Sequence, residues 1–133
     1  MHIEARTRFL TLAEAIEIHD YQIEHFGGID GLRSIDLLES AVGVPESSFG
    51  GNYLHSTIPD MAAAYPFHLV ENHPFADGNM RAGATAAPVF LELKGYEFNA
   101  SNEELIRVVL QVASGNMPKE TPFQFFRQHS RCS

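Results

Sequence analysis

The sequence is nearly devoid of cysteine, with Cys132 as its one thiol among 133 residues. A disulfide within the chain is therefore excluded, which suits a reducing compartment. The sequence also lacks any run of about 18 uncharged apolar residues, the length that a membrane-spanning helix needs. Residues 1–20 contain no apolar core of the kind that a secretory signal peptide requires. These absences predict a cytoplasmic protein with no membrane partner.

Positive charge is scarce. Nine Lys and Arg residues stand against seventeen Asp and Glu residues, which gives a formal net charge of −8 at pH 7. A protein that binds nucleic acid through bulk attraction to phosphates needs the opposite balance, so we expect no direct nucleic-acid partner. A small anion site built from backbone N–H groups and one Arg remains compatible with this charge.

Internal repeats, low-complexity tracts and Pro/Gly/Ser-rich linkers are absent as well. The length is that of one domain, and 44% hydrophobic with 20% charged residues is an ordinary globular composition. We therefore predict that residues 1–133 form a single domain. A chain of this size buries enough surface to fold without a disulfide or a structural metal.

No segment alternates apolar and polar residues as a half-buried strand does, and the pattern predicts an all-α protein of about six helices. Capping residues, glycines and helical spacing place these helices at residues 12–26, 35–42, 59–71, 79–94 and 102–114, with a short last helix starting at Thr121-Pro122. Residues 46–58 predict a loop or a short hairpin. Pro66 and Pro88 fall inside two of the helices, where we expect bends or 3₁₀ turns.

The segment from His73 to Arg81, HPFADGNMR, carries the chemistry. It lies between two apolar helices, just before a helix N-terminus, whose unpaired N–H groups and dipole bind anions. Gly78 allows close backbone approach, Arg81 suits phosphate oxygens, and Asp77 is a hard oxygen ligand of the type that holds Mg²⁺ beside phosphates. His73 supplies an imidazole, the side chain that most often serves as a general base. These parts together predict phosphoryl or nucleotidyl transfer.

Ordinary structural explanations exist for the same residues. His73 would then be a solvated loop residue, Asp77-Gly78 a turn, Phe75 a core residue and Arg81 a surface charge. The turn explanation accounts for neither Asn79 nor Arg81. His19, His25, His55 and His129 have no motif context and receive no role.

HPFADGNMR resembles the signature of the Fic/Doc family, whose general form is H-P-F-x-D/E-G-N-G/K-R, at every position but one. The segments GGIDGLRSIDLLESAVGVPESSFGG and FLELKGYEFNASNEEL are also similar to flanking parts of Doc-type chains. The resemblance covers residues 12–127. It implies a compact, all-α Fic-type bundle of about six helices, with residues 46–58 as a flap that aligns nucleotide or target.

The resemblance implies a role for each motif residue. His73 would be the catalytic base that takes a proton from a hydroxyl group on a target protein. Asp77 would hold Mg²⁺. Gly78 and Asn79 would line the nest for nucleotide phosphates, and Arg81 would bind a distal phosphate. The implied cofactor is Mg²⁺, with ATP as substrate.

Phe75 would be a buried anchor for the loop in the same comparison. The implied partners are a target protein with an acceptor Ser, Thr or Tyr hydroxyl, such as a translation factor, and a separate antitoxin chain. The motif does not decide between transfer of phosphate and transfer of AMP, and a homo-oligomer stays open.

Three features differ between this sequence and the wider family. Met80 stands where Gly or Lys is usual, so a Lys charge near the phosphate is missing. Ala84 stands where many adenylylating members have a second Arg, which favours the Doc side. Glu71-Asn72 fits the end of the inhibitory motif of some members, but Phe67 stands where that motif needs Ser or Thr. Met80 motivates the alternative hypothesis of a catalytically degenerate binding module with the same fold.

Overall fold

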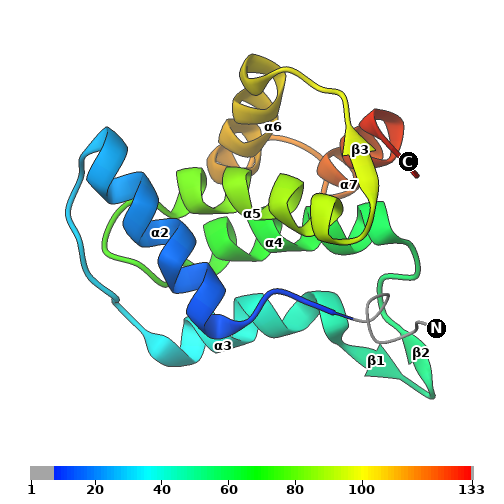
Figure 1. Cartoon of the computed structure of the whole chain (residues 1–133), viewed down its shortest axis with the longest axis horizontal. Helices are drawn as coiled ribbons and strands as arrows, with labels where there is room; N and C mark the ends of the chain where they lie inside the picture. The colour runs from blue at the N-terminus through cyan, green and yellow to red at the C-terminus, as the bar shows by residue number, and fades with distance from the viewer. Residues whose placement is uncertain (1–7, 133) are drawn as a thin grey trace.

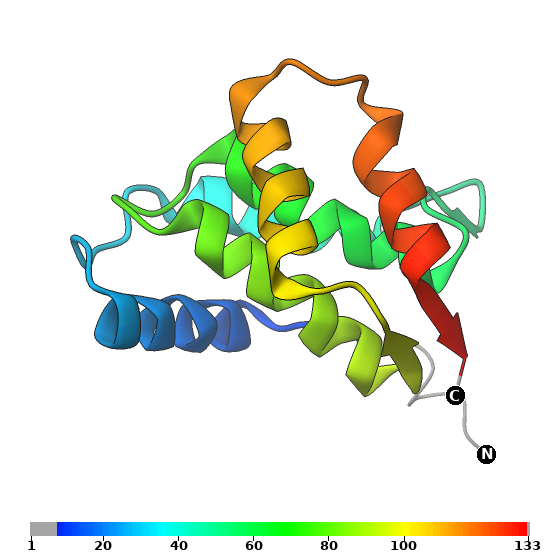
Figure 2. The same cartoon turned by 90° about the horizontal axis from the view of Figure 1, so that it is seen from above.

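Two antiparallel helices form the centre of the fold in the computed structural model, which describes residues 8–132. They are α4 (Ile58–Asn72) and α5 (Asn79–Leu93), and they lie side by side in Figures 1 and 2. Small residues let them approach closely. A Cβ atom at Gly83 of α5 would lie 2.8 Å from Cα of Pro66 in α4, so glycine is needed at this contact.

The other helices pack around this pair (Figure 1). Helix α2 lies against α5, α3 and a following 3₁₀ turn lie against α4, and α6 and α7 cover the opposite side (Figure 2). Their bounds are α2 Leu12–Phe26, α3 Ile35–Gly43, the turn η1 Val44–Glu46, α6 Asn102–Ser114 and α7 Glu120–His129. The six helices among the described residues confirm the predicted mostly helical fold.

Side-chain caps fix where the helices begin. Thr11 and Ser101 each form a full capping box, and Ser34 accepts a hydrogen bond from the Leu37 N–H, as predicted. Thr57 caps α4 and was not predicted as its cap, because Pro59 dominated the sequence pattern there. The helix bounds differ from the predicted ones by at most one residue.

Of the bends or 3₁₀ turns expected at the interior prolines, the 3₁₀ turns are wrong. Both α4 and α5 are assigned as continuous α-helix through Pro66 and Pro88. A proline inside a helix costs about 3 kcal/mol when the helix stands alone. Pro66 is fully buried between packed helices, so tertiary burial offsets the lost hydrogen bond.

Short strands complete the structure. The hairpin β1 (Ser48–Phe49) and β2 (Asn52–Tyr53) occupies the segment predicted as a loop or hairpin. A second pair, β3 (Tyr96–Phe98) and β4 (Ser130–Cys132), was not predicted. Three residues are too few to show alternation, and the partner strand lies far along the chain, so local sequence carries no signal for it.

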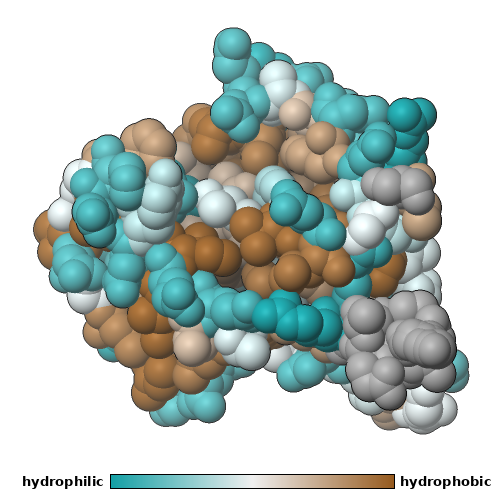
Figure 3. All heavy atoms as spheres, in the orientation of Figure 1, coloured by the Kyte–Doolittle hydropathy of each residue, from teal (hydrophilic) through white to brown (hydrophobic). Residues whose placement is uncertain are grey.

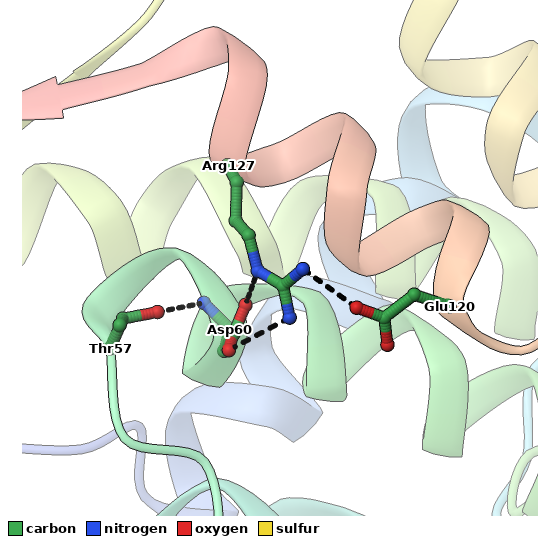
Figure 4. Close-up of polar contacts among 4 residues, drawn as sticks. All are labelled: Thr57, Asp60, Glu120 and Arg127. Atoms are coloured by element: carbon green, nitrogen blue, oxygen red, sulfur yellow. Dashed lines mark hydrogen bonds and ion pairs between the residues drawn. The ribbon is translucent and has the colours of Figure 1, made fainter.

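An ion-pair cluster ties α7 to the start of α4 (Figure 4). The Arg127 guanidinium donates to both carboxylate oxygens of Asp60, at 2.6 and 3.1 Å, and to Glu120 at 2.6 Å. Asp60 is 9% exposed, and its N–H donates a hydrogen bond to the Thr57 hydroxyl oxygen. The hydrogen bonds that Arg127 donates to Asp60 raise the pKa of Arg127 further above its already high value. The bidentate geometry makes this pair stronger than an ordinary surface salt bridge.

Within residues 8–132, no helix combines the length and the apolar character needed to span a bilayer. Apolar side chains nevertheless reach the surface in the middle of the face on which α2 lies, bordered by hydrophilic groups (Figure 3).

Candidate functional site

The loop between α4 and α5 begins at His73, which ends α4 in the left-handed region at φ 55°. Two hydrogen bonds from Arg33, a residue of the earlier loop between α2 and α3, hold this turn. Arg33 donates from Nε to the His73 carbonyl at 2.7 Å and from Nη2 to the Asn72 carbonyl at 3.0 Å. A cation at a helix C-terminus also interacts favourably with the helix dipole. The backbone of His73 is therefore fixed, while its side chain is exposed.

A second loop, residues 27–34, clamps the motif loop by backbone pairing. The N–H groups of Arg33 and Ser34 both donate to the Pro74 carbonyl, at 2.7 and 3.0 Å. The Ala76 N–H donates to the Gly31 carbonyl at 2.9 Å, and Leu32 and Phe75 form an isolated bridge. The motif loop thus has a defined conformation before any ligand binds.

The side chain of Asn79 forms its hydrogen bonds within the motif loop itself. Its Oδ1 accepts from the Phe75 N–H at 2.9 Å and its Nδ2 donates to the Phe75 carbonyl at 3.0 Å. Asn79 is 4% exposed and Phe75 is 2% exposed. Any contact of Asn79 with an anion must therefore come from its backbone N–H, which narrows the role expected from the sequence.

His19 is the residue that sequence reasoning missed. It lies in α2 with 1% exposure, and its ring stacks on Phe75 at a centroid distance of 3.7 Å and an interplanar angle of 4°. Its Nε2 donates to the Asp77 carbonyl at 2.7 Å. One signal was available: Ala15, His19 and Gln22 are the buried residues of α2, so two polar side chains stand on its core-facing stripe.

Asp77 carries the negative charge of the site. Its Oδ2 accepts from the Ile29 N–H at 3.1 Å and its Oδ1 accepts from the Gly78 N–H at 2.9 Å. These bonds, first the one from Ile29, hold the pKa of Asp77 below its ordinary value. The loop leaves no space for a side chain beside this carboxylate, because a Cβ at Gly28 would lie 2.8 Å from Oδ2.

The start of α5 offers unpaired donors. Gly78 occupies the N-cap position at φ 79° and provides no side-chain cap. The N–H groups of Asn79, Met80 and Arg81 make no hydrogen bond to another residue in the described part of the chain. A free helix N-terminus with a glycine cap is the arrangement that receives phosphate oxygens.

A cavity of about 320 Å³ opens at these donors. It brings together most of the predicted residues, and its lining consists of Gly27, Val70, His73, Asp77, Gly78, Asn79, Met80, Arg81 and Ala113. Phe75 lies outside this lining and packs in the core beneath the loop. The side chains of an imidazole, a carboxylate and a guanidinium thus share one cavity with a helix N-terminus.

Arg81 and Met80 both line this cavity, and they determine how much positive charge its side chains provide. The Arg81 guanidinium lies over the Phe26 ring, 4.5 Å from its centroid, and makes no ion pair within residues 8–132. Met80 is half-buried and packs against the core. The cavity therefore has one cationic side chain, and that side chain is held by a ring rather than by an acid.

The sequence model of the Fic/DOC family matches residues 9–91, more than half of the chain and the whole of this cavity except Ala113. The chain belongs to the Fic/Doc family. Two characterised relatives agree. The chain is 36% identical over 75 residues to the Toxin Doc of Mycolicibacterium smegmatis, covering 56% of this chain and 58% of that protein. It is 24% identical over 110 residues to the Protein kinase doc of Escherichia phage P1, covering 83% of this chain and 86% of that protein.

Membership confirms the resemblance of the HPFADGNMR motif and accounts for the mostly helical fold. The chain spans little more than half the length of the mycobacterial relative. The roles of individual motif residues remain predictions.

Proposed function

We propose that this protein is a Doc-like toxin that transfers phosphate from Mg·ATP to a hydroxyl side chain of a target protein. The observation that carries the proposal is the cavity in which His73 and Asp77 face the unpaired N–H groups at the start of α5. Polyphosphate would lie on those N–H groups, where the helix dipole favours negative charge. Arg81 would leave the Phe26 ring to bind a distal phosphate in the bidentate manner that guanidinium allows.

Asp77 fits the role of a Mg²⁺ ligand. It is exposed at the cavity, it is ionised at neutral pH, and each of its oxygens accepts one N–H and keeps a further lone pair. Mg²⁺ typically binds through one or two protein carboxylates together with substrate phosphates and water. Mg²⁺ held there would neutralise phosphate charge as it develops.

His73 would act as the base. Its imidazole takes the proton of the acceptor Ser, Thr or Tyr hydroxyl while the oxygen bonds to the γ-phosphorus, and the bond to the β-phosphate bridging oxygen breaks, releasing ADP. The fixed backbone at His73, held by Arg33, would keep the imidazole at the cavity mouth. We expect His73→Ala to lose at least about a hundredfold in transfer rate.

AMP transfer would use the same residues with a different bond broken. The hydroxyl oxygen would then attack the α-phosphorus and release pyrophosphate. We favour phosphate because the relative that this chain matches over most of its length is named a protein kinase, and because Ala84 supplies no second cation near the helix start. ATP labelled on the γ-phosphate should label the target, and ATP labelled on the α-phosphate should not. Label from the α-phosphate alone would establish AMP transfer instead.

The biological setting proposed is that of a toxin with a separate antitoxin chain, in the cytoplasm. An apolar groove of about 470 Å³ between α2, α5 and α6 supports such a partner, because Phe26 and Arg81 line it next to the cavity. The proposed target is a translation factor. Expression of the chain alone should arrest bacterial growth and reduce protein synthesis, and His73→Ala should restore both. Growth arrest that is unchanged by His73→Ala would contradict a catalytic toxin.

A second candidate function is a binding module that keeps the fold without catalysis. Met80 favours it, because this side chain packs against the core and brings no charge to the cavity. Met80→Lys decides between the two. If Met80→Lys gains transfer activity and the parent protein has none, the parent is a binding module. If both are active and His73→Ala is inactive, the parent is an enzyme.

A further inference from the structure

A second cluster of metal-ligating side chains lies behind the motif loop. One ligand atom from each of His19, Asp20 and Asp30 lies within 4.8 Å of the other two. His19 and Asp20 belong to α2, and Asp30 belongs to the loop that follows α2. The His19 Nδ1 atom is 3.8 Å from Asp20 Oδ1, too far for a hydrogen bond but close enough for both to bind one ion.

The hydrogen bond on the other ring nitrogen sets the state of this imidazole. A backbone carbonyl can only accept, so the 2.7 Å contact with the Asp77 carbonyl places the proton of neutral His19 on Nε2. Nδ1 then carries the lone pair. The ring cannot turn to hide that lone pair, because it is buried at 1% exposure and stacked on Phe75.

A buried nitrogen lone pair that lies close to carboxylate oxygens is unfavourable without a cation between them. In the described part of the chain, no group donates a hydrogen bond to His19 Nδ1. The charged groups that share this cluster with His19 are the carboxylates of Asp20 and Asp30. The arrangement repeats a feature of histidines that bind metals, whose second ring N–H donates to a backbone carbonyl or carboxylate and so fixes the tautomer.

We propose that His19 Nδ1, Asp20 and Asp30 form a binding site for a divalent transition-metal ion such as Zn²⁺, with water completing the coordination. An imidazole ligand favours Zn²⁺ over Mg²⁺, which takes oxygen ligands. The exposed Asp20 and Asp30 side chains are free to shorten the ligand separations. This site is separate from the Mg²⁺ position proposed at Asp77 and does not rest on the proposed enzymatic function.

Metal at this site would connect α2 to the loop of residues 27–34. Ile29, next to Asp30, donates its N–H to the Asp77 carboxylate, and His19 donates to the Asp77 carbonyl. Bound Zn²⁺ therefore stabilises both groups that hold Asp77, the loop through Ile29 and the helix α2 through His19. The expected signature is a melting temperature that rises with Zn²⁺ concentration, since an ion that binds the folded state alone stabilises it by mass action.

Isothermal titration of the purified chain with Zn²⁺ tests the site, with Asp20→Asn and Asp30→Asn as the two diagnostic variants. Neither side chain is buried, so both variants should fold. Asp36→Asn, an exposed carboxylate in the first turn of α3, is the matched control. We expect one site whose Zn²⁺ affinity falls more than about tenfold in each diagnostic variant and stays unchanged in the control. Nitrogen-15 NMR of the imidazoles should show Zn²⁺ shifting Nδ1 of His19 while Nε2 keeps its proton.

Two results would overturn the site. Zn²⁺ affinity equal in wild type, Asp20→Asn and Asp30→Asn would place any bound metal on other histidines. An NMR spectrum in which Nδ1 of His19 is protonated and does not respond to Zn²⁺ would show an imidazolium paired with Asp20 instead. Because Mg·ATP binding does not involve Asp20 or Asp30, both variants should retain it, and failure of the enzymatic proposal would leave the Zn²⁺ result unaffected.

Discussion

The imidazole of His19 lies flat on the ring of Phe75, with 3.7 Å between their centroids, and donates a hydrogen bond to the carbonyl of Asp77. This one side chain therefore supports both the apolar and the polar part of the motif loop. It comes from a helix 58 residues away from Asp77 in the sequence. The loop conformation depends on α2 as much as on the motif itself.

His19→Phe separates the two contributions. The substitution keeps an aromatic ring on Phe75 and removes the donor to the Asp77 carbonyl, which leaves a carbonyl without its partner. We expect a loss of about 1–3 kcal/mol in the free energy of unfolding, measured by urea denaturation, together with reduced transfer activity. His19→Ala should cost more because it also removes the stacked ring. A His19→Phe protein as stable as wild type would show that the hydrogen bond contributes nothing.

Asn79→Asp tests the two hydrogen bonds by which the Asn79 side chain holds the backbone of Phe75 in the loop. An Asp side chain can still accept from the Phe75 N–H but offers no donor to the Phe75 carbonyl, so two oxygens would face each other in a buried place. We expect about 1–3 kcal/mol of destabilisation by chemical denaturation. Asn52→Asp in the exposed hairpin is the control and should change stability by less than about 0.5 kcal/mol. Equal destabilisation by Asn79→Asp and Asn52→Asp would show that the Asn79 hydrogen bonds do not stabilise the loop.

Gly83→Ala tests the close contact between α4 and α5. The added methyl group would lie 2.8 Å from Cα of Pro66, and backbone on both sides cannot move without separating the helices. Overpacking of this kind costs about 1–3 kcal/mol. Gly43→Ala at the end of α3 is the matched control, because nothing lies within 4 Å of its Cβ position and its φ is −79°. Thermal unfolding should therefore show a lower melting temperature for Gly83→Ala and an unchanged or higher one for Gly43→Ala.

The pH dependence of the loop follows from Asp77. Hydrogen bonds from Ile29 and Gly78 hold the folded pKa of Asp77 below its ordinary value of 3.8. A carboxyl group whose pKa is lowered by folding adds stability above its unfolded pKa and loses it as the pH falls through the lowered folded pKa. NMR titration of the Asp77 carboxyl carbon should give a midpoint below 3.8. A midpoint at or above that value would mean that the two N–H bonds do not persist in solution.

The helical framework was predictable because its signals are local. Thr11, Ser34 and Ser101 cap helices through bonds to residues three positions later, and Gly27 and Gly115 end them. The β3–β4 pair was not predictable, because its two three-residue strands meet only when α7 packs back on the core. The helix through Pro66 was predicted as well, but its regular α-helical assignment at the proline was not, because helix propensity does not register the packing that offsets a proline.

The candidate site divides in the same way. The sequence by itself determined the motif, the family, and the placement of His73, Asp77 and Arg81 around the start of one helix, because residues a few positions apart at a helix N-terminus lie close together in space. Only the tertiary structure decided that Asn79 turns inward to Phe75, that Arg81 lies on Phe26, and that His19, Arg33 and Ile29 hold the loop. Apart from the local bonds between Asn79 and Phe75, those contacts join segments about 40 to 60 residues apart. A hydrogen bond between distant segments leaves no periodicity in the sequence from which it could be predicted.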